Sequence, residues 1–121
     1  MKPAIKKLRQ ELIDGMVEFM EDDKDDVVTY KQSDIDRCAK YVDEFLASLA
    51  RVPKADKSEY IMQAVKTIVI QMNKLNEACE GGLIETDQRE QLYELIAAAA
   101  KDAGLAIEEG HDITEKWRTY W

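Results

Sequence analysis

The apolar residues of this chain recur at helical spacing, and the widest apolar face lies between Ser58 and Cys79. This face covers more than half of the circumference of a helix, so the helix needs neighbours on two sides. Asn73 falls on the remaining polar strip. The members of the apolar face are Tyr60, Ile61, Met62, Ala64, Val65, Ile68, Val69, Met72, Leu75, Asn76 and Cys79.

The residues that follow predict a second helix that turns back on the first. Gly81 and Gly82 can end a helix in the left-handed conformation, and Thr86 is the expected N-cap of the next helix. This second helix carries a run of alanines from Ala97 to Ala100. Because alanine adds little bulk, we expect the helix to lie unusually close to its hairpin partner.

Two further amphipathic stretches, from Lys2 to Asp22 and from Ser33 to Ala50, bring the number of main helices to four. Asp112 and Glu115 have the spacing of a capping box, which predicts a short terminal helix from Ile113 to Tyr120. The connections between the main helices are short enough to favour antiparallel neighbours. The sequence therefore predicts an all-α fold, an antiparallel bundle of four main helices with a short fifth helix at the C-terminus.

The composition indicates one globular domain over residues 1–121, with 45% hydrophobic and 35% charged residues. Cys38 and Cys79 lie on apolar helix faces. We interpret them as small buried hydrophobic residues in a reducing compartment, rather than as a disulfide or a ligand pair. Acidic residues interrupt the N-terminal apolar pattern, so no secretory signal is expected there, and no stretch is long enough to span a membrane. We therefore expect a cytoplasmic protein.

The formal net charge of −8 argues against nucleic acid and against anionic membranes as partners, because both depend on clustered lysine and arginine. The charge permits a basic protein partner or simple solubility, and solubility is the commoner explanation. It does not by itself decide between these two explanations.

The densest run of charge follows the first helix. A calcium loop is not indicated, because the run has no glycine for the turn and no glutamate at the closing position. The first helix also has basic residues at its start and acidic residues at its end, which is unfavourable for the helix dipole. Either packing compensates for this arrangement, or the acidic end serves a cationic partner. The candidate partner-binding residues here are Glu21, Asp22, Asp23, Asp25 and Asp26.

Aromatic residues are concentrated at the end of the chain, at Trp117, Tyr120 and Trp121. They allow two interpretations. Ile113, Trp117 and one of the last two aromatic residues can dock on the bundle and tie the chain end down. Alternatively, the aromatic residues form an exposed anchor for a partner.

The segment from Leu75 to Glu90, with its Ile-Glu-Thr-Asp-Gln-Arg-Glu turn, and the segment from Asp112 to Arg118 resemble those of a group of small uncharacterised bacterial proteins. The likeness covers roughly the second half of the chain. The compact, acidic, helical character of these proteins is similar to that of some toxin-neutralising immunity proteins. The resemblance implies no particular functional residues.

Few residues indicate catalysis. His111 is the single histidine, it lies in an expected loop, and no nucleophile elbow, glycine-rich phosphate loop or CxxC motif accompanies it. Glu108 and His111 have the spacing of a di-iron motif, but only in one copy. We therefore expect no enzymatic activity, no metal and no cofactor.

Three functional hypotheses follow. The leading one is an immunity-like or regulatory module that binds another protein through its acidic surface. The second is a homo-oligomer or structural module that uses the C-terminal aromatic residues or the alanine face. The third is a small-ligand binder or enzyme, which would need a pocket with converging polar groups such as Asn73, Asn76 and Tyr93.

Overall fold

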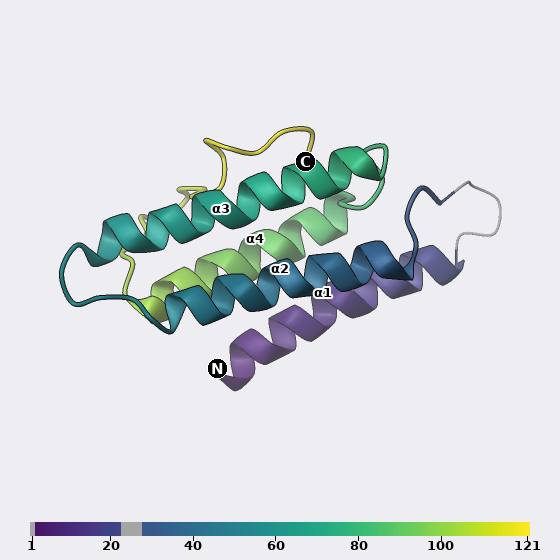
Figure 1. The fold of residues 1–121 in the computed structure, drawn as a ribbon. Coiled ribbons are helices and arrows are strands. Elements are labelled where there is room, and N and C mark those ends of the chain that lie inside the picture. The colour runs from purple at the N-terminus through teal and green to yellow at the C-terminus, as the bar shows by residue number, and fades with distance from the viewer. Residues whose placement is uncertain (1, 23–27) are drawn as a thin grey trace.

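The computed structural model describes residues 2–22 and 28–121, and this part of the chain contains four helices and no strand (Figure 1). Successive helices run in opposite directions, so the predicted antiparallel four-helix bundle is confirmed. No helix among these residues is long and apolar enough to cross a membrane. The helices are α1 (Pro3–Asp22), α2 (Gln32–Leu49), α3 (Lys57–Ala78) and α4 (Thr86–Ala103).

The helices pack most extensively in two pairs, α1 with α4 and α2 with α3. The expectation that the alanine-rich helix α4 lies closest to its hairpin partner α3 is therefore wrong. Ala99 and Ala100 are buried, but Gly15 of α1 leaves room for the side chains of Gln88 and Gln91 of α4, so α4 fits closely against α1. The other side of the α3 and α4 pair is covered by the C-terminal segment (Figure 1).

The α3–α4 turn is built around the side chain of Asn76, a polar residue on the apolar face of α3. Its Oδ1 accepts hydrogen bonds from the main-chain N–H groups of Leu83 and Ile84 at 3.1 and 3.0 Å. The main-chain carbonyl oxygen of Asn76 accepts a hydrogen bond from the N–H of Gly81. Gly81 has a φ of 76°, which is the left-handed conformation predicted for this helix end. Asn76 is 1% exposed because it supplies hydrogen bonds that the buried turn would otherwise lack.

The predicted N-cap role of Thr86 is wrong. Thr86 is the first residue of α4, Glu85 takes the N-cap position, and no side chain caps this helix end. Because Asn76 positions the two residues before Glu85, the turn places the helix start one residue earlier than the sequence suggests.

The prediction of a short fifth helix is also wrong, since residues 113–117 form turns and residues 118–121 are irregular. Asp112 uses its carboxylate to fold the chain locally. It accepts hydrogen bonds from the N–H and the hydroxyl of Thr114 at 2.8 and 2.6 Å. It also forms an ion pair with Arg118 at 2.6 Å. The expected capping residue thus closes a compact turn instead of starting a helix.

The side chain of Asn73 in α3 binds the rest of this segment through hydrogen bonds. Its Nδ2 donates to the carbonyl of Trp117 at 2.6 Å, and its Oδ1 accepts the N–H of Thr119 at 3.1 Å and the indole N–H of Trp121 at 2.6 Å. Tyr120 has a φ of 61°, which a helix does not tolerate. Asn73 is 8% exposed, because the C-terminal segment covers this part of the polar strip of α3. The sequence did not predict this cover.

Replacing Asn73 with alanine should release the C-terminal segment from α3. Each partner left buried without a hydrogen bond costs about 1–3 kcal/mol, so the free energy of unfolding should fall by at least that amount. Denaturant unfolding followed by tryptophan fluorescence measures this loss, with a red-shifted native emission as Trp121 becomes solvated. Lys74→Ala, at the exposed neighbouring position, is the control. Equal stability of the two variants would show that Asn73 does not hold the segment.

Candidate functional site

The two ends of the bundle differ in charge. The end of α1, residues 28–31 and the α3–α4 turn lie at one end, where exposed acidic residues outnumber basic ones among the described residues. Lysine and arginine predominate at the opposite end. The acidic end is defined here by Glu18, Glu21, Glu77, Glu80, Glu85 and Asp87. The basic end is defined by Lys2, Lys6, Lys7, Arg51, Lys54, Lys57 and Lys101.

This separation opposes the dipoles of two helices. In an antiparallel bundle, the acidic end receives the C-termini of α1 and α3 and the N-termini of α2 and α4. Asp34 and Asp87 lie favourably in the first turns of α2 and α4, but neither α1 nor α3 has a basic residue in its last turn. Each acidic residue at a helix C-terminus costs about 0.3–1 kcal/mol when exposed. The acidic C-terminal end noticed in α1 therefore recurs in α3 through Glu77, although the first turn of α3 holds Glu59 in a favourable position.

Only part of the predicted acidic run can be placed. Glu21 is exposed in the last turn of α1, and Asp22 is the last residue of that helix. Asp23, Asp25 and Asp26 lie outside the described residues. The predicted run thus begins at the acidic end of the bundle.

The acidic residues of the α3–α4 turn were missed in the sequence, because they are far from Glu21 along the chain and only the fold brings them to the same end. A hydrogen bond from the Thr29 hydroxyl to the carbonyl of Cys79 ties the α1–α2 connection to the end of α3. Glu80, with a φ of 57°, follows directly. This contact keeps both parts of the acidic end together.

Phe19 adds an apolar group to the acidic end. Its side chain is 38% exposed, and its ring stacks on that of Tyr30 with the centroids 6.5 Å apart. The Tyr30 hydroxyl donates to the carbonyl of Met16 at 2.8 Å and so fixes the ring on α1. An aromatic residue held rigidly among charges is typical of the central contact of a protein interface.

The C-terminal aromatic residues are divided between core and surface. Trp121 is buried beneath the guanidinium of Arg118, whose central carbon lies 5.7 Å from the ring centroid. Ile113 is fully buried in the core, and Trp117 is half-buried and packs against it. Tyr120 is 87% exposed. The docked interpretation therefore describes both tryptophans, and Tyr120 alone points to solvent.

Electrostatics support this docking. Burial by itself would raise the pKa of Asp112, but the hydrogen bonds from Thr114 and the charge of Arg118 outweigh it and hold the pKa below its usual 3.8. A carboxyl group with a lowered pKa contributes stability that is complete above its usual pKa and is lost as the pH falls through the folded value.

Asp112→Asn should therefore lower the free energy of unfolding at pH 7 by about 1–3 kcal/mol. The difference from the unmodified protein should shrink as the pH falls below 3.8, because the native carboxylate is then protonated. Urea unfolding at several pH values measures this convergence. Glu109→Gln, exposed in the same segment, is the control and should not change stability at pH 7. A difference that stays constant down to the acid limit would contradict the role of the charge.

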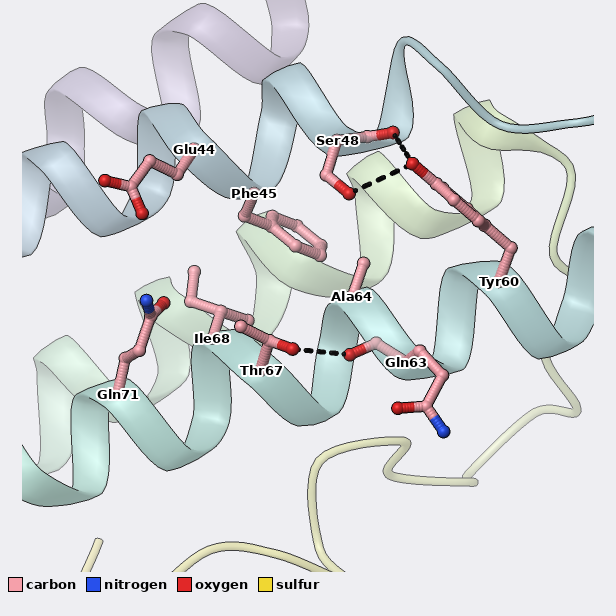
Figure 2. A pocket seen from close by; sticks show the side chains of 9 residues that line it. All are labelled: Glu44, Phe45, Ser48, Tyr60, Gln63, Ala64, Thr67, Ile68 and Gln71. Atoms are coloured by element: carbon pink, nitrogen blue, oxygen red, sulfur yellow. Dashed lines mark hydrogen bonds between the residues drawn. The ribbon is translucent and has the colours of Figure 1, made fainter.

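A small groove between α2 and α3 has a volume of about 200 Å³ (Figure 2). At one end of the groove, the side chain of Tyr60 reaches from α3 to α2, and its hydroxyl donates to the carbonyl of Ser48 at 2.9 Å. Thr67 donates its hydroxyl to the carbonyl of Gln63 within its own helix, at 2.9 Å. These hydroxyl groups are therefore used within the protein, and the remaining polar side chains of the lining are those of Glu44, Gln63 and Gln71.

The polar residues proposed for a ligand pocket do not converge on one. Asn73 binds the C-terminal segment, Asn76 binds the α3–α4 turn, and the Tyr93 hydroxyl donates to the carbonyl of His111 at 3.1 Å. Their hydrogen bonds organise the chain itself. His111 is exposed, and no group of three or more metal-ligating side chains occurs among the described residues.

Cys38 and Cys79 are free and buried, as predicted. Burial raises the pKa of the Cys38 thiol to about 12. Burial, with the neighbouring Asp34 carboxylate, raises the pKa of the Cys79 thiol to about 11. Since only the thiolate is a good nucleophile, neither cysteine suits covalent chemistry at neutral pH.

Alkylation at pH 8 tests this assignment. With the pKa raised from 9.0 to about 11 and about 12, the thiolate fractions are about a hundredfold to a thousandfold below those of ordinary cysteines. Iodoacetamide should label neither cysteine in the native protein, and both after denaturation, as counted by intact mass. Rapid labelling of the native protein would contradict the burial of the thiols.

No family model matches this chain, and no similar protein was found among curated proteins or solved structures. A function therefore has to follow from the geometry of the chain itself.

Proposed function

We propose that this protein is a binding module whose acidic end docks a cationic protein, as an immunity-like or regulatory protein would. The observation that carries the proposal is the convergence of α1 and α3, which both end in acidic residues against their dipoles. At the C-termini of these two helices, stability alone favours the opposite placement of charge. A binding role gives a reason for keeping it.

The contacts at this end suit an interface. Phe19 supplies a partly exposed aromatic anchor, and Tyr30 holds it in place. Exposed Glu18 and Glu21 flank the anchor on α1, and the exposed glutamates of α3 lie at the same end of the bundle. Such charges steer a partner of opposite sign and speed its association, while a buried aromatic contact slows dissociation.

The homo-oligomer hypothesis has less support from the geometry. Trp121 is buried and Trp117 is half-buried, so most of the aromatic surface that it needs is already used within the chain. Tyr120 remains exposed. The oligomeric mass is the direct test of this alternative.

The variant that tests the proposal neutralises four glutamates at the C-terminal ends of α1 and α3. The partner is first captured from lysate of the source organism at low and high salt. Association with the purified partner is then measured by stopped flow or biosensor. The on-rate should fall about tenfold or more and depend less on salt. The substitutions are Glu18→Gln, Glu21→Gln, Glu77→Gln and Glu80→Gln.

Stability distinguishes lost binding from lost folding. The same variant should unfold at equal or higher denaturant concentration, because each substitution removes a charge that opposes a helix dipole. A control with the same net charge keeps the acidic end intact and should bind normally. An unchanged on-rate in the test variant, or an equal loss in the control, would rule out docking at the acidic end. The control substitutions are Glu11→Gln, Glu44→Gln, Glu108→Gln and Glu109→Gln.

A further inference from the structure

A groove of about 620 Å³ opens at the basic end, between α1, α2 and α4. Figure 1 shows the N-terminal half of α1 diverging from α2 in this region. A groove of this volume is within the range of small-molecule sites. Its apolar lining includes Ile5, Leu46, Ala47, Leu49, Ala99 and Ala103.

Two ion pairs border the groove. Ile5 and Arg9 occupy one face of α1, because they are four residues apart, and Lys2 directly precedes the helix. Lys2 pairs with Asp102 of α4, and Arg9 forms a two-pronged pair with Asp43 of α2 at 2.7 and 3.0 Å. Ile5 lies between the two cations and is 5% exposed. Asp43 and Asp102, the aspartates that line the groove, are therefore both paired with cations, Arg9 of α1 and Lys2 directly before it.

The cations keep unused donors. Arg9 binds Asp43 through Nε and Nη2, so its Nη1 group has no acceptor among the described residues. The side chain of Lys2 is 71% exposed, and an ammonium group has hydrogens beyond the one that faces Asp102. The other residues of the basic end add to the positive potential around the groove.

We propose that this groove binds an amphipathic carboxylate, such as a free medium- or long-chain fatty acid. The hydrocarbon chain lies along Ile5, Leu46 and the alanines, which leave the space that larger side chains would fill. The carboxylate is bound by Arg9 at the rim, through the donors that Asp43 does not use. This site is independent of the proposed function, since it lies at the opposite end of the bundle and uses different residues.

The choice of an anionic ligand is tested with three ligands of equal chain length, titrated into the whole protein by calorimetry below their micellar concentrations. Decanoate should bind one to one, at least tenfold more tightly than decanol or decyltrimethylammonium. Equal binding of decanol would reduce the site to non-specific apolar contact. Tighter binding of the cation would assign the ligand to the aspartates. Either result overturns the proposal.

Two substitutions break the same ion pair and should have opposite effects. Arg9→Gln should weaken decanoate binding about tenfold, whereas Asp43→Asn should preserve or strengthen it, because it frees Arg9 for the ligand. The exposed position of this pair means that neither change should prevent folding, which thermal melts check. An equal loss of binding in both variants would mean that the pair only supports the structure, and would overturn the role of Arg9.

A third substitution tests the location. Ala47 is exposed on the wall of the groove, so Ala47→Phe should fill it and abolish decanoate binding with little effect on stability. Ala78→Phe, at an exposed position at the end of α3, is the matched control and should bind normally. Light scattering of the unliganded protein completes the test. A dimer that Ala47→Phe disperses would show that a second copy occupies the groove, and would overturn the proposal.

Discussion

The structure depends on covering α3, whose apolar face is too wide for the two helices beside it. Residues of this helix face α2, α4 and the C-terminal segment. The third cover is held mainly by one side chain, because the amide of Asn73 binds both Trp117 and Trp121. A buried amide with three partners is worth more than its apolar equivalent only while all three are present. The C-terminal segment is therefore an integral layer of the fold.

Asn76, one turn further along α3, has the same role for the next connection. Its Oδ1 accepts two main-chain N–H groups of the α3–α4 turn, and this contact sets where α4 begins. The two asparagines explain why the covered side of α3 is not purely apolar. Irregular segments packed on a helix bring main-chain polar groups with them, and side-chain amides can both donate to these groups and accept from them.

The extent to which the sequence predicted the fold follows from the range of the interactions. The four helices and the buried cysteines depend on local periodicity, so the pattern of apolar residues was sufficient. The capping roles of Thr86 and Asp112 were misjudged, because Asn76 fixes the main chain before Thr86 and Asn73 fixes the main chain after Asp112, both from distant positions in the sequence. Propensity near a helix end could not reveal these long-range contacts.

The acidic end shows the same limit for a candidate site. Glu21 was identified because it belongs to a dense local run, whereas Glu77 and Glu80 are sparse in sequence and reach this end only through the topology. The inverted charge of α1 was visible in the sequence, where helix packing alone was enough to explain it. The acidic C-terminal turn of α3 could be linked to it only when the antiparallel packing placed the C-termini of both helices at the same end of the bundle.

The acidic end and the apolar groove can act as separate sites. Glu21 and Arg9 are twelve residues apart in α1, which is about 18 Å along the helix axis. Exposed charges are screened over about 8 Å at physiological ionic strength, so a charge at Glu21 hardly changes the potential at Arg9. Direct electrostatic coupling between the two ends is therefore negligible. A ligand in the groove could influence the acidic end only by moving α1, and the ion pairs of Lys2 and Arg9 are the contacts through which it would have to do so.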